Sequence, residues 1–561
     1  MIDSNRQFWK QSFFVLLVLL SMSIPLSRFT MSSFQFLLVL VWLLDGLSTS
    51  LISQFYNENN FVKAIYHTIK YFIELVASNL VTKFTLFLQN KTALIIFSIY
   101  ALHIVGLIHT SDFDYALKDL RTKVPLFILP LMLASMPKPS IRQIYFLLLL
   151  YVLAVFGGTL VSFNEYLKQD FDDIRKISLF ISPVRFGLNI VFSFFILLYF
   201  LFQNTNQNIW KQLAICSLMF WFVSFLILLE SGIGIICIFV VGLGLLLYKV
   251  LSAKSLRYRV LMTFLFLTLP ILAYVYVNRQ VSQILQKPNI DFSTLDKKSK
   301  LGNGYLHDTI NFGIEDGKFM GIYMATNEMA DAWNKRSKYK FLGHDEANQL
   351  IQYTLIRYLT SKDLRKDAEG VNLLTDKDVH LIEKGIANVN YVENPSIKTR
   401  ISKILLGYQR YTSFHDPNGS SVMQRIEHWK ASIIIIKEHF WTGVGTGDIP
   451  AAFKETYERI NSPLKEQSRW RAHNQYLSFW TAFGIFGTIW FIFVLLYLLV
   501  VNHNYKNYLF SVFWVIIIMS MFTEDTIETQ DGVTFFTFFL SLFALWLPSK
   551  NSSTEDKIET K

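Results

Sequence analysis

The chain has 561 residues, of which 52% are hydrophobic and only 17% charged. This composition excludes an ordinary soluble globular protein, and apolar runs long enough to cross a bilayer recur along the chain. The two cysteines, Cys216 and Cys237, lie in apolar segments and can build neither a disulfide framework nor a thiolate metal site. We therefore expect an all-α, polytopic membrane protein in contact with a lipid bilayer, with no nucleic-acid partner.

Hydropathy predicts about twelve membrane-spanning helices. Residues 61–90 are not among them, because charged side chains interrupt an amphipathic pattern that is typical of an interfacial helix. The span that contains Pro125 and Pro130 is expected to be short and broken or tilted. The twelve expected spans are 12–27, 33–52, 91–109, 123–136, 141–162, 184–202, 209–229, 231–249, 258–277, 474–501, 508–523 and 533–548.

The charges between these spans predict how the chain lies in the membrane. Lysine and arginine gather in the connections around 63–91, 138–142, 211, 249–259, 506 and 550, and acidic residues gather in those around 112–119, 165–173, 230 and 524–531. Basic connections mark the cytoplasmic side, so both termini are expected in the cytoplasm and the long polar segment on the outer face. The predicted organisation is a membrane domain of about nine helices plus the interfacial helix (1–277), an outer loop domain (278–472), C-terminal membrane helices (473–548) and a cytoplasmic tail (549–561).

The outer loop is polar and mostly helical in pattern. Its second part predicts a helix over 421–440 that lies on the membrane, then a glycine turn over 443–448, then a helix over 449–459. Backbone amides of a glycine turn can bind a phosphate. This turn lacks the Lys-Ser/Thr that follows in a P-loop, which favours an ordinary turn between two helices.

The stretch Arg469–Gly487 places two arginines and a histidine at the mouth of an apolar helix. His473 is a candidate general base, because a neutral imidazole can take a proton from a hydroxyl near pH 7. Arg471 can bind phosphate oxygens with two parallel hydrogen bonds, and Asn474 lies beside them. The alternative is a helix end that its arginines anchor to lipid headgroups.

Two further arginines are candidates for binding an anion. Arg185 follows Pro183 and opens an apolar helix at its outer end, where helix N-termini favour negative charge. Arg425 begins the surface helix. The alternatives are an arginine that extends to the interface for the first, and a salt bridge or headgroup contact for the second.

An acidic edge separates the last two spans. It consists of Glu524, Asp525, Glu528 and Asp531. Their spacing matches no metal motif and no histidine is close in sequence, so no metal site is expected. We interpret the edge as a topology signal and a possible partner for an arginine.

The chain resembles the O-antigen ligase / O-antigen polymerase family of bacterial envelope glycosyltransferases, over about 420–500. The motifs that carry the resemblance are the glycine turn 443–448 and Ala472-His473-Asn474-Gln475-Tyr476-Leu477, followed by Gly484-Ile485-Phe486-Gly487. Arg185 within Val184-Arg185-Phe186-Gly187 is similar to the family's membrane-proximal arginine. The run from Glu524 to Gln530, with Gly532, is similar to the variant of Bacteroidetes-type members.

The resemblance implies a GT-C-like fold and an enzyme of lipopolysaccharide biosynthesis in the bacterial inner membrane, with its large loop in the periplasm. The implied donor is a glycan on undecaprenyl pyrophosphate, and the acceptor is a hydroxyl of a glycan, of lipid A-core or of a protein. His473 would be the base, and Arg185, Arg471, Arg425, Asn474 and Tyr476 would bind substrate. The transfer would be inverting and would need neither metal nor cofactor.

The chain departs from the family pattern at one point. Many members carry Ser-Arg at the outer start of the eighth span, whereas this chain has Glu230-Ser231-Gly232. A second phosphate-binding arginine must then come from elsewhere, and Arg471 and Arg425 are the candidates. The aromatic residues Trp470, Tyr476 and Trp480 are expected to stack on sugar rings or to line a groove for the lipid.

Three other functions remain open from the sequence. A polymerase of the same family differs only in its acceptor. A transporter of a lipid-linked glycan usually shows broken helices and charges at the membrane midplane, whereas here the charges lie at the ends of spans. A purely structural membrane protein gives no reason for His473 beside two arginines.

Overall fold

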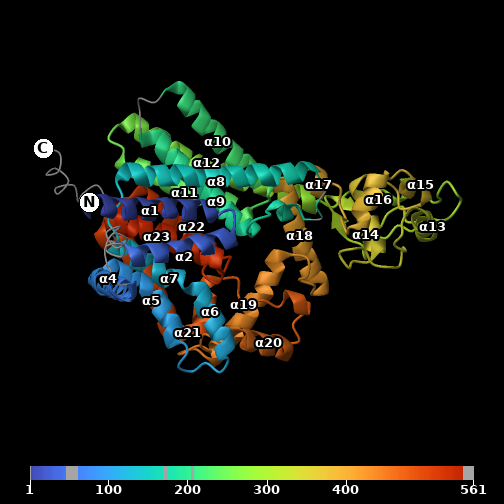
Figure 1. Ribbon diagram of the computed structural model, residues 1–561. Coiled ribbons are helices and arrows are strands. Elements are labelled where there is room, and N and C mark those ends of the chain that lie inside the picture. The colour runs from blue at the N-terminus through green and yellow to red at the C-terminus, as the bar shows by residue number, and fades with distance from the viewer. Residues whose placement is uncertain (1, 46–60, 169–170, 172, 204–207, 548–561) are drawn as a thin grey trace. The chain divides into compact units, whose positions relative to one another are not determined.

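The computed structural model describes residues 2–45, 61–168, 171, 173–203 and 208–547, and this part of the chain is mostly helical (Figure 1). The only β-sheet in these residues consists of two strands of two residues each. The predicted all-α class is thus confirmed. The predicted tail 549–561 lies outside the described residues. The chain divides into two compact units.

The first unit contains residues 1–160, 180–222 and 424–561. The helices that contribute to it are α1 (Ile2–Ser23), α2 (Arg28–Leu44), α4 (Phe61–Gln89), α5 (Lys91–Val105), α6 (Phe113–Lys123), α7 (Pro125–Ser135), α8 (Ile141–Lys168), α9 (Pro183–Gln203), α10 (Ile209–Leu228), α19 (Ser421–Glu438), α20 (Ile449–Arg459), η3 (Glu466–Ser468), α21 (Gln475–Val500), η4 (Val501–Lys506), α22 (Tyr508–Met521), α23 (Gln530–Ser541) and η5 (Leu542–Trp546).

Helices from both ends of the sequence pack together in this unit. The short helix α7 contacts α4, α5 and α23, and α9 contacts α22 (Figure 1). Phe192 on α9 lies between rings of α22 and α23, with ring centroids 5.0 Å from Phe513 and 4.9 Å from Phe539. Such edge-to-face pairs add stability beyond the burial of their apolar area. The packing holds the start of α9 next to the loop between α22 and α23.

Seven described helices are long and apolar enough to cross a membrane. Several expected spans instead form shorter helices, such as the 11-residue α7, so the count of twelve is not confirmed. The segment predicted to be interfacial forms the 29-residue α4, and its length and composition suffice for a crossing. The seven are Ile65–Gln89, Ile141–Lys168, Pro183–Gln203, Ile209–Leu228, Gly232–Ser252, Leu256–Leu285 and Gln475–Lys506.

The second unit contains residues 161–179 and 223–423. Its polar part folds around a buried core in which Trp333, Leu355 and Tyr358 are fully buried. Its elements are η1 (Ile174–Ile177), α11 (Gly232–Ser252), α12 (Leu256–Leu285), η2 (Phe292–Thr294), β1 (Ile314–Glu315), β2 (Lys318–Phe319), α13 (Thr326–Arg336), α14 (Ile351–Ser361), α15 (Ala368–Asn372), α16 (Asp376–Glu383), α17 (Asn390–Glu393) and α18 (Ile397–Phe414).

Candidate active site

His473 lies between η3 and α21 in a left-handed backbone conformation, with φ +47°. A residue other than glycine is rarely found there, and such strain concentrates at functional sites. Asp525 holds this conformation: its carboxylate accepts the backbone N–H of His473 and of Asn474, both at 3.1 Å. It also accepts the hydroxyl of Ser478 at 2.6 Å. The loop between α22 and α23 therefore fixes the backbone of His473.

Glu524, the neighbour of Asp525, faces two basic groups. Its Oε1 forms an ion pair with Arg425 at 2.7 Å, and its Oε2 lies 3.8 Å from Nδ1 of His473. The second distance is too long for a hydrogen bond. Nδ1 of His473 is buried, and it has no hydrogen-bond partner among the residues that the structure describes. Glu524 thus pairs fully with the arginine and only loosely with the histidine.

The charges around the imidazole set its protonation. Burial lowers the pKa of His473, but its interaction with Glu524 and the charge of Asp525 outweigh burial and raise the pKa above the ordinary 6.5. Burial raises the pKa of Glu524, but His473 and Arg425 outweigh it and lower the pKa overall. Glu524 is therefore ionised at neutral pH, and the two carboxylates favour the protonated form of His473.

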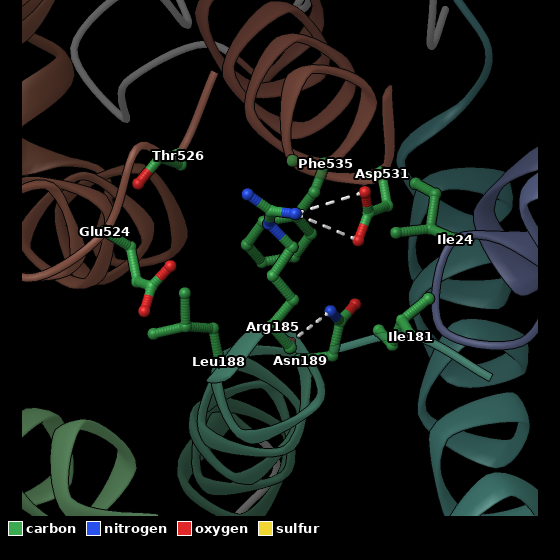
Figure 2. A pocket seen from close by; sticks show the side chains of 10 residues that line it. Ile24, Ile181, Arg185, Leu188, Asn189, Glu524, Thr526, Asp531 and Phe535 are labelled. Atoms are coloured by element: carbon green, nitrogen blue, oxygen red, sulfur yellow. Dashed lines mark hydrogen bonds and ion pairs between the residues drawn. The ribbon is translucent and has the colours of Figure 1, made fainter. Parts of the chain in front are cut away.

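Arg185 lines a small pocket together with Glu524 (Figure 2). Its guanidinium points toward Asp531, at 3.2 Å, and donates to the backbone carbonyl of Asp525 at 3.1 Å. In Figure 2 Glu524 lies on the side of the guanidinium opposite Asp531. Arg185 bonds Asp525 and lines a pocket with Glu524, and His473 contacts the same two residues. Arg185 and His473 therefore lie around the same loop.

His428 is a second imidazole at the site. It lies one helical turn after Arg425 on α19, and its ring centroid is 5.3 Å from that of His473. Its Nε2 is 2.9 Å from the backbone carbonyl of Ser468, which can only accept, so this nitrogen carries the proton. Burial, together with the charges of His473 and Arg425, lowers the pKa of His428 to about 4. His428 is therefore neutral at physiological pH.

Arg471 lies in a buried charge network rather than in an open site. Its guanidinium pairs with Glu528, donates to the hydroxyl of Tyr115 and lies 3.6 Å from Asp119. Lys123 bonds both acids, at 2.6 Å to Asp119 and 2.7 Å to Glu528. Two cations and two anions balance each other here. The guanidinium of Arg471 contacts two acids of this network, whereas that of Arg425 pairs with Glu524 beside His473. Arg425 is therefore the better second candidate for phosphate.

The side chains of Asn474 and Tyr476 form hydrogen bonds with backbone groups of the helix bundle. The side chain of Asn474 caps α21 by accepting the backbone N–H groups of Tyr476 and Leu477, both at 3.1 Å, and it donates to the carbonyl of Phe522. The hydroxyl of Tyr476 donates to the carbonyl of Ile518 at 3.3 Å. Both residues hold the start of α21 in place, and their predicted contact with substrate stays a prediction.

The glycine turn 443–448 is a structural link. The backbone N–H groups of Val444 and Gly445 donate to the carbonyls of Thr481 and Ala482, at 2.9 Å each. Gly484 has φ +64°, and a Cβ there would lie 2.1 Å from the carbonyl oxygen of Trp441, so only glycine allows this approach. Because these amides are already bonded, they are not directed at a phosphate, which agrees with the interpretation as an ordinary turn.

The segment Glu230-Ser231-Gly232, where the family pattern has Ser-Arg, carries a buried acid. Glu230 forms an ion pair with Lys403 at 2.9 Å within the second unit. Among the described residues, no group of three or more His, Cys, Asp or Glu side chains is arranged to hold a metal ion.

Sequence reasoning missed Asp525 as a backbone clamp and His428 as a neighbour of His473. Of these two, only His428 could have been found from the sequence. Residues three apart on a helix share a face, and His428 follows Arg425 at that spacing. The clamp depends on a contact across fifty residues of sequence, which spacing does not reveal.

Comparison with protein-family models matches residues 385–492 to the family described as O-Antigen ligase. The match contains α18, α19, α20 and the start of α21, and hence Arg425, His428 and His473. No curated protein matches the chain. Residues 385–492 therefore match a domain of the O-antigen ligase family, a family associated with glycosyltransferase-type ligase activity. The resemblance is confirmed for the motifs at 443–448, 472–477 and 484–487.

Proposed function

We propose that the protein is an inverting, metal-independent glycosyltransferase of the O-antigen ligase type. It moves a glycan from an undecaprenyl-pyrophosphate carrier to an acceptor hydroxyl at the periplasmic face of the bacterial inner membrane. The observation that carries this proposal is the site around Glu524. The carboxylate of Glu524 pairs with Arg425, lies near the imidazole of His473 and lines the same pocket as Arg185. Arg425 and His473 lie within the segment that matches the family.

Each group has one task in the proposed reaction. Arg425 and Arg185 bind the oxygens of the diphosphate and stabilise the charge that grows on it as it leaves. Nε2 of His473 takes the proton of the acceptor hydroxyl. The acceptor oxygen bonds to the anomeric carbon opposite the carbon–oxygen bond that breaks, and that electron pair leaves with the diphosphate. A diphosphate is a good leaving group, so no general acid is required.

The same proposal includes the arrangement in the membrane. The charged groups of the site come from the start of α9, from α19, from the segment before α21 and from the loop before α23. The charge pattern places all of these segments on the outer face. We propose a multi-pass protein with both termini in the cytoplasm and the polar loop in the periplasm, where a lipid-linked donor and a glycan, lipid A-core or protein acceptor meet.

The test is a complementation assay in a strain that lacks the gene, scored by gel laddering of surface glycan. His473→Ala and Arg425→Ala should abolish the ladder although both proteins reach the membrane at normal levels. His439→Ala is the matched control, because His439 is exposed at the end of α19. A normal ladder with His473→Ala would remove the base assignment.

Two further readouts separate the finer parts of the proposal. A purified assay should retain transfer after addition of a chelator, and loss of activity that Mg²⁺ restores would contradict metal independence. In the deletion strain, accumulation of lipid-linked polymer indicates a ligase. Loss of all chains longer than one repeat would instead indicate a polymerase.

A further inference from the structure

The carboxylate of Glu524 occupies the place where the proposed function needs an anion. It pairs with Arg425 at 2.7 Å, and it lines the same pocket as Arg185 (Figure 2). Both arginines are the proposed ligands of the donor diphosphate. Opposite charges attract strongly at a buried site, so a diphosphate that binds Arg425 must compete with Glu524 for the guanidinium.

The second oxygen of the same carboxylate, Oε2, lies near His473 without forming a hydrogen bond to it. Nδ1 of His473 lies 3.8 Å from Oε2 of Glu524 and has no hydrogen-bond partner within the described residues. A shift of about 1 Å would bring the two atoms to hydrogen-bond distance. A carboxylate that accepts the N–H at Nδ1 fixes the tautomer and leaves the lone pair on Nε2, as a base requires.

We propose that Glu524 is a positioning residue with two alternative partners, Arg425 in the free enzyme and His473 in the donor complex. The inference rests on the proposed function. The diphosphate of the donor binds Arg425 and displaces the carboxylate, which then accepts the N–H of Nδ1 of His473. The imidazole becomes an oriented base only when the donor is present, so the acceptor is not deprotonated at an empty site.

The surrounding charges allow this exchange. His473 faces Glu524 and Asp525 of the loop before α23, and Arg425 and His428 of α19. Asp525 is already engaged by two backbone N–H groups and a hydroxyl, so it holds the loop while Glu524 moves. Burial opposes the ionised form of Glu524, but His473 and Arg425 lower its pKa, so the carboxylate is charged in both arrangements.

The experiment compares the full-length protein with Glu524→Gln in two assays. The first measures binding of undecaprenyl diphosphate, without a glycan, to the purified protein in detergent. The second measures transfer as a function of pH. Glu427→Gln is the matched control, because Glu427 is a buried acid two residues from Arg425 that pairs with Lys430 at 2.7 Å.

Glu524→Gln should bind undecaprenyl diphosphate about fivefold more tightly, because the competing charge is gone, and should lower kcat by about tenfold or more. The acid limb of kcat/KM should move to lower pH, since this carboxylate raises the pKa of His473. Glu427→Gln should change neither. Unchanged or weaker diphosphate binding by Glu524→Gln, or an unmoved acid limb, would overturn the inference. The binding assay needs no transfer, so a failure of the proposed function, seen as normal transfer by His473→Ala, is recognised separately.

Discussion

The carboxylate of Asp525 accepts the backbone N–H of His473 at 3.1 Å and so holds that residue in its left-handed conformation. The backbone carbonyl of the same aspartate accepts a hydrogen bond from Arg185, also at 3.1 Å. One residue thus fixes the imidazole with its side chain and an arginine with its main chain. The relative position of the proposed base and the proposed phosphate ligand depends on this contact.

Asp525→Asn should therefore impair both stability and transfer. An amide offers one oxygen where the carboxylate offers two, and its NH₂ group would meet the N–H of His473 or of Asn474. We expect a loss of about 1–3 kcal/mol in the free energy of unfolding, and about a hundredfold loss of transfer because the imidazole is displaced. Thermal unfolding in detergent and the transfer assay measure the two effects.

Asp448→Asn is the matched control for this substitution. Asp448 also accepts two successive backbone N–H groups, those of Ser111 and Asp112 at 2.8 Å each, but it belongs to the glycine turn. It should lose a similar amount of stability while transfer by the folded protein is retained. Equal transfer by the two variants would show that the clamp on His473 has no role beyond folding.

Sequence reasoning found the groups that chemistry requires but not their partners. His473 and Arg185 stood out because a cation or an imidazole at the end of an apolar helix is costly there, and Arg425 stood out because it begins the surface helix. The structure brings Arg425 and His473 to one carboxylate. Arg471 stood out for the same reason as His473. Its partners, Asp119 and Glu528, lie more than fifty residues away in sequence, so the neutralisation of its charge could not be read from the chain.

The sequence predicts those features of the fold that depend on composition. It does not predict those that depend on tertiary packing. Apolar runs identified the helices of the membrane part, and the two prolines identified α7 as short. Among the lysines that suggested an interfacial helix at 61–90, Lys83 is buried and pairs with Asp45 at 3.2 Å. A charge that finds a partner on another helix no longer argues against a span.

The pH dependence of transfer follows from the raised pKa of His473. A base must be neutral to accept a proton, so kcat/KM should fall as the pH drops through that pKa. Burial opposes the shift, but Glu524 and Asp525 raise the pKa above 6.5, so the half-maximal point should lie above pH 6.5. Steady-state kinetics between pH 5 and 9 provide the measurement. An acid limb below pH 6 would mean that another group acts as the base.

His428→Phe tests which of the two imidazoles titrates. The pKa of His428 is lowered to about 4, chiefly by burial, so its removal should leave the acid limb near its original pH. Phenylalanine fills the space, but the carbonyl of Ser468 loses its donor, which should cost about 1 kcal/mol of stability. Transfer should persist in His428→Phe and be lost in His473→Gln. If both variants are equally inactive, the assignment of the base to His473 alone is wrong.

The buried network around Glu528 should contribute to stability through charge balance. Glu528→Gln leaves Lys123 and Arg471 with Asp119 as the one remaining acid of the four, and an uncompensated buried charge costs about 3–5 kcal/mol. Lys123→Met alone should also destabilise, because it leaves two acids with one arginine. The double variant has one cation and one anion again, so it should recover part of the lost stability.

Acid pH adds an independent readout for the same network. Burial raises the pKa of Glu528, but Lys123 and Arg471 outweigh burial and hold it well below the ordinary value. A carboxyl with a lowered folded pKa stabilises the protein above its unfolded pKa of about 4.3 and loses that contribution as the pH falls. Wild type should therefore lose more stability than Glu528→Gln as the pH falls below about 4.3. Identical acid profiles, or strictly additive effects of the two single substitutions in the double variant, would show that the charges of Glu528 and Lys123 are not coupled.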